Sequence, residues 1–227
     1  FFPRKYNKNA INLINQNNIP LVLVDREMPE CQTNFVRCDD YQGGYIAGKH
    51  LLELGHRHFL YLPGPKYNLS QTRRYAGIMD ALSEANVPAS NIREIDYHTV
   101  FGSSAESTSS YKPYEELFFP VNYTAVIGFN DLQSYSAMEI LQKKGYRIPE
   151  DISLISFDHL RKTHTYLPPL TSIADNSEKS IADTAVSILL DKIRNPSSEI
   201  SSEVLPVSIF DDHTTGPINE TFAHSFE

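Results

Sequence analysis

Residues 145–160, GYRIPEDISLISFDHL, contain the pattern that decides the fold class of this chain. A polar turn ends at Asp151, a short apolar run follows, and the run stops at Asp158. A continuous apolar run of this length, bounded by turn residues, is typical of a strand that is buried on both faces of a sheet. The stretch therefore predicts a buried strand over residues 153–158 that ends in a carboxylate.

Similar apolar runs recur along the chain and alternate with helical patterns. In residues 41–56, YQGGYIAGKHLLELGH, the apolar side chains follow helical spacing, and Gly55 predicts the end of the helix. Helices are predicted over residues 7–18, 41–56, 70–87 (capped by Ser70), 112–119, 132–146 and 177–194. Strands are predicted over residues 19–25, 33–39, 58–64, 91–98, 124–131, 153–158, 170–175 and 203–213. This alternation predicts an α/β fold in which helices cover both faces of a parallel sheet.

The composition is that of a globular protein with a substantial core, because 41% of the 227 residues are hydrophobic and 21% are charged. The formal net charge of −8 excludes binding of a nucleic-acid backbone through the overall charge of the chain. No apolar run of 18 residues occurs and residues 1–10 lack the apolar core of a signal peptide, so we expect a cytoplasmic protein without a membrane span. Cys31 and Cys38 predict two reduced thiols, although their spacing also permits a disulfide.

Polar side chains follow several of the predicted strands. In open parallel sheets, ligands bind beyond the carboxyl ends of the strands, so side chains at these positions are candidates for a shared binding site. The alternative is that an Asp or Asn after a strand caps the next helix, and for Asp158 this is less plausible because residues 159–165 do not open a clear helix. The candidates are Asp25, Asp39, Asp40, Asn130, Asp131 and Asp158.

Five segments, in this order, carry a resemblance to a known family: VRCDDYQGGYIAGKHLLELGHRHFLYLPGP (36–65), RRYAGIMDAL (73–82), AVIGFNDLQSYSAMEIL (125–141), GYRIPEDISLISFD (145–158) and YLPPLTSI (166–173). They resemble the sensor domain of the LacI/GalR family of bacterial transcription regulators. The resemblance implies two doubly wound parallel-sheet lobes of the periplasmic-binding-protein type I fold, joined by crossing strands, with an effector bound between them.

The resemblance also implies how the chain is divided. Residues 1–65 are expected to form the remainder of an N-terminal lobe that lacks its first strand-helix-strand unit. Residues 66–205 are expected to form mainly the C-terminal lobe, and residues 206–227 a closing strand and tail. No helix-turn-helix segment rich in Arg and Lys is present, so the DNA-binding head is expected to be absent from this chain.

Three residues match the family's effector-binding positions. Arg74 in RRYAG matches an arginine that hydrogen-bonds the effector, Asn130 in GFND matches an amide at a strand tip, and Asp158 in SFDHL matches a carboxylate that accepts two hydroxyl protons of a sugar. A guanidinium offers five donors in a fixed fork, which suits vicinal oxygens. The alternative for Arg74 is a surface salt bridge, as expected for its neighbour Arg73.

The outer part of the implied site includes the polar residues Gln42 and Asp175, and the alternative for each is helix capping. It also includes Tyr67 or Phe157 as an aromatic face for a sugar ring, and the alternative for each is packing. An arginine that the family usually carries near the last strand is replaced by Asp212. Tyr135 and Tyr166 match positions in the family's dimer interface, and the alternative for each is an exposed tyrosine.

Enzymatic functions are poorly supported. No G-x-S-x-G elbow, P-loop or dinucleotide fingerprint occurs, and the histidines do not follow zinc-ligand spacing, so we expect no catalytic residues, cofactor or metal. Two functions therefore remain: the effector-sensing domain of a transcriptional repressor, or an extracytoplasmic sugar-binding protein. The first is favoured, with a mono- or disaccharide effector, operator DNA bound through a head outside this chain, and a homodimer as the expected partners.

Overall fold

The computed structural model describes residues 8–65, 68–95 and 114–223, and the chain divides into two compact units. The first unit contains residues 1–39 and 175–208, and the second contains residues 40–174 and 209–227. The boundaries expected from the sequence lay after residues 65 and 205, so the observed boundaries differ from them. The difference arises because the helix at residues 40–53 packs on the second unit, whereas the last long helix packs on the sheet of the first.

The first unit is a parallel three-stranded sheet with a helix on each face. Its strands have the order β1 (Val22–Val24), β2 (Asn34–Cys38) and β8 (Ser202–Leu205). On one face, Ala185 and Ile188 of α6 (Ile181–Arg194) pack with Val36. On the other face, Ile11 of α1 (Lys8–Gln16) packs with Leu23. Each face of the sheet thereby carries a helix, and β1 is largely buried, whereas Ser202, Glu203 and Val204 of the edge strand β8 are exposed.

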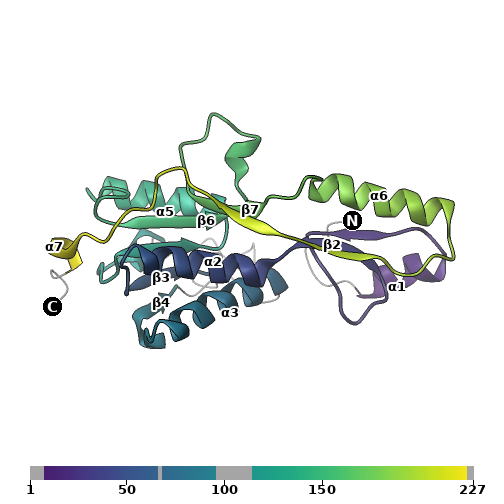
Figure 1. The fold of residues 1–227 in the computed structure, drawn as a ribbon, viewed down its shortest axis with the longest axis horizontal. Helices are drawn as coiled ribbons and strands as arrows, with labels where there is room; N and C mark the ends of the chain where they lie inside the picture. The colour runs from purple at the N-terminus through teal and green to yellow at the C-terminus, as the bar shows by residue number, and fades with distance from the viewer. Residues whose placement is uncertain (1–7, 66–67, 96–113, 224–227) are drawn as a thin grey trace, which may run out of the picture. The chain divides into compact units, whose positions relative to one another are not determined.

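The second unit contains most of a six-stranded sheet with helices on both faces (Figure 1). The strand order is β4 (Ile92–Glu94), β3 (Phe59–Leu62), β5 (Ala125–Gly128), β6 (Ser153–Phe157), β7 (Ser172–Asp175) and β9 (Val207–Phe210). In Figure 1, α5 (Asp131–Lys143) lies on one side of this sheet, and α2 (Asp40–Glu53) and α3 (Leu69–Glu84) lie on the other. The α/β fold with parallel sheets that the sequence predicted is therefore confirmed.

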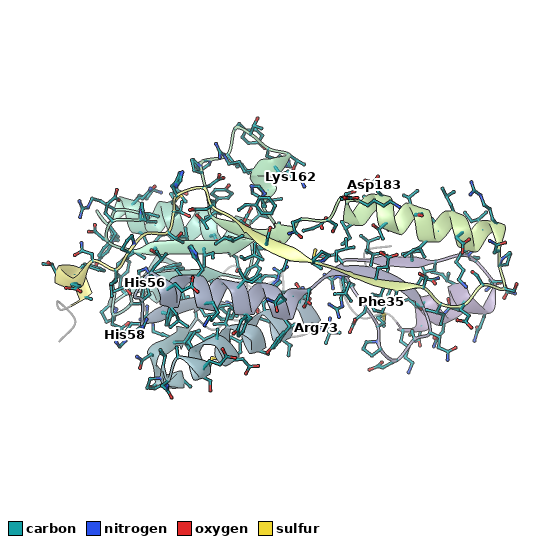
Figure 2. All side chains as sticks on the ribbon, viewed as in Figure 1. Phe35, His56, His58, Arg73, Lys162 and Asp183 are labelled. Atoms are coloured by element: carbon teal, nitrogen blue, oxygen red, sulfur yellow. The ribbon has the colours of Figure 1, made fainter. Side chains whose placement is uncertain are left out.

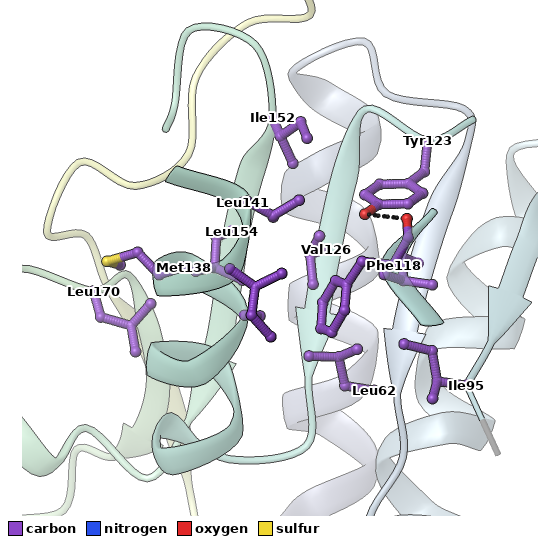
Figure 3. Close-up of a cluster of buried hydrophobic side chains, with 13 residues drawn as sticks. Leu62, Ile95, Phe118, Tyr123, Val126, Met138, Leu141, Ile152, Leu154 and Leu170 are labelled. Carbon is purple, nitrogen blue, oxygen red and sulfur yellow. Dashed lines mark hydrogen bonds between the residues drawn. The ribbon is translucent and has the colours of Figure 1, made fainter. Parts of the chain in front are cut away.

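Alternate side chains of the central strands form the core beneath α5 (Figure 3). Met138 and Leu141 of α5 pack with Val126 of β5 and Leu154 of β6. All residues of β3, β5 and β6 are buried, so these three strands form a rigid centre. The carboxyl ends of the same strands carry the residues of the candidate site.

Several local predictions can be compared with the structure directly. Gly55 and Gly145 both have a positive φ after a helix, as expected for glycines that end helices. The predicted cap of α3 is wrong, because the side chain of Asn68 accepts from the backbone N–H of Ser70. The short helix predicted over residues 112–119 is a 3₁₀ turn, η2 (Tyr114–Phe118). The remaining short elements are η1 (Ala89–Asn91), η3 (Leu160–Lys162) and α7 (Glu220–Ala223).

Cys31 and Cys38 do not form a disulfide, and Cys31 is buried. This agrees with the expected pair of thiols rather than with the disulfide. Within the described ranges, no helix is both long and apolar enough to cross a bilayer.

His56 connects three segments of the second unit at the amino-terminal edge of its sheet (Figure 2). The residue is 2% exposed, its Nδ1 lies 2.9 Å from the hydroxyl oxygen of Thr124, and its Nε2 lies 3.0 Å from the carbonyl oxygen of Gly216. Because a carbonyl can only accept, Nε2 carries the proton of the neutral ring. Burial lowers the pKa of His56 to about 4.

We therefore expect the fold to lose stability in mild acid through His56. Above pH 6.5 the histidine is neutral in both states and contributes no pH dependence. As the pH falls below about 6.5, the unfolded chain binds a proton that the folded chain does not bind until about pH 4, so unfolding is favoured. The expected loss at pH 5 is about 2 kcal/mol of the free energy of unfolding.

The measurement is urea unfolding of the wild type, His56→Gln and His58→Gln at pH 7.5 and pH 5. His58 is the matched control because its side chain is exposed (Figure 2). His56→Gln is expected to be less stable at pH 7.5 but to depend less on pH. An equal loss between the two pH values in all three proteins would contradict this role.

Candidate functional site

The position of Arg74 is set by close packing of α2 on α3. A Cβ atom added to Gly44 would lie 1.9 Å from the backbone oxygen of Arg74, and one added to Gly77 would lie 2.0 Å from the backbone oxygen of Tyr41. The two helices therefore touch backbone to backbone, which only glycine permits at these positions. The glycines of the YQGGYIAG and RRYAG segments are in this way part of the geometry of the site.

The Arg74 guanidinium is buried and is held from several directions. Its Nε donates to Asp40 at 2.9 Å, and one terminal nitrogen donates to the backbone oxygen of Phe129 at 2.6 Å. The guanidinium carbon lies 5.0 Å from the ring centroid of Phe129 and 4.5 Å from that of Phe157. A cation between two aromatic rings and a buried carboxylate has little freedom to reorient. The alternative of an exposed surface salt bridge does not apply, because Arg74 is 6% exposed.

Asp158 follows β6 directly and lies beside Arg74. Its carboxylate is 42% exposed, and its Oδ1 accepts from the other terminal nitrogen of Arg74 at 3.4 Å, near the upper limit for a hydrogen bond. The backbone at Asp158 has a φ of 97° and that at His159 a φ of 51°, both in the left-handed region. Asp158 does not cap a helix; its carboxylate is presented to solvent next to a fixed cation.

Asn130 follows β5, the strand next to β6, and caps α5. Its side-chain oxygen accepts from the backbone N–H of Gln133 at 3.0 Å, so the capping alternative applies to this oxygen. The side-chain NH₂ has no hydrogen-bond partner within residues 8–65, 68–95 and 114–223. The cap thus fixes Asn130 and leaves its donor group for a ligand.

The other residues that the resemblance implied have different surroundings. Gln42 is exposed on α2. Asp175 accepts from the backbone N–H of Ser177 at 2.8 Å and so caps a turn in the first unit. Phe157 is 2% exposed, and its contact with a cation is with Arg74, which corresponds to the packing alternative. Tyr67 lies outside the residues that the structure describes.

Asp212, which replaces an arginine of the family pattern, has a clear structural partner. It accepts from Arg161 at 2.9 Å, so the departure from the pattern creates an ion pair between η3 and the segment after β9.

The two tyrosines expected in a dimer interface differ in their surroundings. Tyr135 donates its hydroxyl to the backbone oxygen of Pro168, whereas Tyr166 is 81% exposed.

Two contributors to the site were not assigned from the sequence. Asp40 was considered only as a strand-tip residue, yet it is the buried partner of Arg74, and its Oδ2 has no hydrogen-bond partner in the described part of the chain. Phe129 supplies both a backbone acceptor and an aromatic face to Arg74. Arg74 lies 34 positions from Asp40 and 55 from Phe129, so no local spacing connects them.

The site thus combines an exposed carboxylate, a fixed guanidinium and an amide donor at the carboxyl ends of neighbouring strands. Carboxylate oxygens accept from hydroxyl groups, and guanidinium and amide nitrogens donate to hydroxyl oxygens. Such an arrangement matches a ligand with several adjacent hydroxyl groups. Across the described ranges, no three His, Cys, Asp or Glu side chains gather into a group that could hold a metal ion.

Comparison with known proteins agrees with this fold. The model of the periplasmic binding protein-like domain matches residues 49–215. The HTH-type transcriptional repressor PurR of Escherichia coli O139:H28 is 34% identical over 194 residues, which are 83% of this chain and 54% of that protein. The PurR repressor of Mannheimia succiniciproducens is 32% identical over 176 residues, 77% of this chain and 51% of that protein. This chain therefore spans about half the length of these relatives.

Among solved structures, a LacI family transcriptional regulator from Enterococcus faecium with bound ribose superposes with a TM-score of 0.79. It is 26% identical, and the match covers 96% of this chain and 80% of that one. The matched model covers most of the chain, and the relatives named here are LacI-type regulators and repressors. The chain therefore belongs to the periplasmic binding protein-like family and is an effector-binding domain of the LacI/GalR type.

Proposed function

We propose that this chain is the effector-sensing and dimerisation domain of a bacterial transcriptional repressor and that its effector is a neutral mono- or disaccharide. Arg74, Asn130 and Asp158 bind the hydroxyl groups of the sugar. The full protein binds operator DNA in the cytoplasm through a head domain outside this chain. The observation that carries the proposal is the exposed Asp158 carboxylate beside the buried, fixed Arg74.

The charge at the site favours a neutral ligand. Asp158 and the buried Asp40 place two carboxyl groups around the single guanidinium of Arg74. A phosphate placed against Asp158 would meet a carboxylate, and among the described residues the cation paired with Asp158 is Arg74, which also pairs with Asp40. The long contact of 3.4 Å between Arg74 and Asp158 leaves both groups able to bind a hydroxyl that lies between them. The ribose in the related E. faecium regulator supports the same ligand class.

The alternative of an extracytoplasmic sugar-binding protein is not favoured, because the relatives at 32% and 34% identity are repressors. In a repressor, the sugar acts by binding one conformation of the protein more tightly than another. The resulting shift cannot exceed this difference in affinity, which is commonly about 1–3 kcal/mol. A sensing role therefore requires no catalytic group at the site.

The dimer is also part of this proposal, with Tyr135 and Tyr166 in the interface. Tyr135 lines a shallow groove of about 630 Å³ together with Leu132, Leu167 and Pro168, and Leu132 is 65% exposed. Exposed tyrosine and leucine side chains beside such a groove suit a protein interface.

A thermal-shift screen tests the proposed ligand class. The panel contains D-ribose, D-glucose, D-galactose, cellobiose and maltose, the 5-phosphate of ribose and the 6-phosphate of glucose, and adenine and guanine. We expect one neutral sugar to raise the melting temperature by about 5–10 °C at one hundred times its Kd. We expect its phosphate to have no such effect. Stabilisation by a nucleobase or only by a phosphorylated sugar would contradict the proposal.

A further inference from the structure

We propose that Asp131 is a positioning residue for sugar recognition, because it holds the segment that presents the Asp158 carboxylate. This inference rests on the proposed function, in which Asp158 binds the sugar. Asp131 itself is 1% exposed and does not reach a ligand at the surface. Nothing in the sequence distinguishes this role from ordinary placement at the start of α5.

Both carboxylate oxygens of Asp131 hold the segment after Asp158, one directly and the other through Ser172. Oδ2 accepts from the backbone N–H of Leu160 at 2.7 Å. Oδ1 accepts from the hydroxyl of Ser172 at 2.9 Å, and the same hydroxyl oxygen accepts from the backbone N–H of His159 at 3.0 Å. The contact to Leu160 is therefore direct, and the contact to His159 passes through Ser172.

These contacts fix three consecutive peptide groups. The backbone N–H of Asp158 donates to the carbonyl oxygen of Ile173 at 3.0 Å, so residues 158, 159 and 160 are each held by a different acceptor. Asp158 and His159 have the φ values of 97° and 51° that L side chains rarely adopt, and such a conformation persists only where the surroundings impose it. Asp131 and Ser172, which is completely buried, are the acceptors for the peptide N–H groups that directly follow these two residues.

Asp131 also links the two polar groups of the site. It is the first residue of α5 and follows Asn130, whose side chain caps the same helix. One buried carboxylate thereby connects the backbone that bears Asn130 with the backbone that follows Asp158. The spacing between the amide donor and the carboxylate acceptor, and with it the choice among sugars, depends on this connection.

The first test measures the ligand-free chain by amide hydrogen exchange in the wild type, Asp131→Ala and Ser172→Ala. The amides of His159 and Leu160 are expected to exchange about 100-fold faster in Asp131→Ala, while the core amide of Val126 keeps its rate. Ser172→Ala is expected to speed the exchange of the His159 amide more than that of the Leu160 amide. If Asp131→Ala does not fold, Ser172→Ala takes its place in this test. Unchanged exchange at both amides would overturn the inference whether or not any sugar binds.

The second test first measures the affinity of the wild type for D-ribose, D-glucose and D-galactose. A double-mutant cycle of Asp131→Ala and Asp158→Asn is then measured with the sugar that binds. Asp131→Ala is expected to weaken binding about tenfold or more, but to have less than about a twofold effect in the Asp158→Asn background. Asp131→Asn, which retains one acceptor oxygen for Leu160, is expected to recover much of the affinity. An equal loss in both backgrounds would refute positioning through Asp158 and leave the proposed function intact, whereas a wild type that binds no sugar would refute the proposed function.

Discussion

Arg74→Ala is expected to abolish sugar binding and to lower the free energy of unfolding by about 3 kcal/mol or more. Binding is lost because the guanidinium is the fixed donor beside Asp158. Stability is lost because the Asp40 carboxylate, whose side chain is 1% exposed, is left as a buried charge without its cation. The cation–π contacts to Phe129 and Phe157 disappear as well. Calorimetric titration and urea unfolding measure the two effects on the same samples.

A second substitution separates the two effects of Arg74. In Arg74→Ala/Asp40→Asn the unpaired charge is removed, so much of the lost stability should return while sugar binding stays absent. Arg73→Ala is the matched control, because Arg73 is the half-exposed neighbour on the same helix (Figure 2), and it should retain binding. If the double variant regained binding together with stability, Arg74 would be a structural residue and not a ligand of the sugar.

Gly77→Ala is expected to destabilise the protein by about 3 kcal/mol or more, although alanine is the better helix former. The added Cβ would lie 2.0 Å from the backbone oxygen of Tyr41 and 2.6 Å from the backbone nitrogen of Tyr45. Neither atom can move without displacing α2 from α3. The expected fall in melting temperature is about 6–12 °C, and differential scanning calorimetry measures it.

The exposed neighbour Ala76 provides the control for Gly77→Ala. Ala76→Gly makes the opposite change one position earlier in α3 and should cost only the loss of helix propensity, about 1 kcal/mol. Because α2 also carries Asp40, the separation of the helices in Gly77→Ala should weaken sugar binding more than Ala76→Gly does. A Gly77→Ala protein as stable as the wild type would mean that the two helices are not in backbone contact.

The alternation of apolar runs was sufficient to predict the fold class, because strands buried on both faces leave an unmistakable pattern. The run SLISF became β6 with every residue buried, and Asp158 stands at its carboxyl end as predicted. The boundaries of the two units were not predicted. They depend on which sheet each helix packs against, and the sequence of α6 specifies an apolar face without specifying its partner.

The site was predicted in part for a similar reason. Arg74, Asn130 and Asp158 were proposed as ligand-binding residues, the last two because they follow strands of one sheet and all three through a family resemblance, and their binding role stays a prediction. The contacts that hold them were not identified, because Asp40, Asp131 and Ser172 are joined to them by side-chain geometry across distant parts of the chain. Asp131 in particular follows a strand like any capping residue, and only its contacts with Leu160 and Ser172 distinguish it.

The central claim is that the Asp158 carboxylate binds hydroxyl groups of a neutral sugar. The most direct measurement is calorimetric titration of the stabilising sugar, and of its analogues that each lack one hydroxyl, into the wild type and Asp158→Asn. We predict that the wild type rejects at least one deoxy analogue by about tenfold or more, and that this discrimination largely disappears in Asp158→Asn, which binds the parent sugar weakly. Equal affinity of both proteins for the sugar, or the same discrimination against each analogue in both, would contradict the claim.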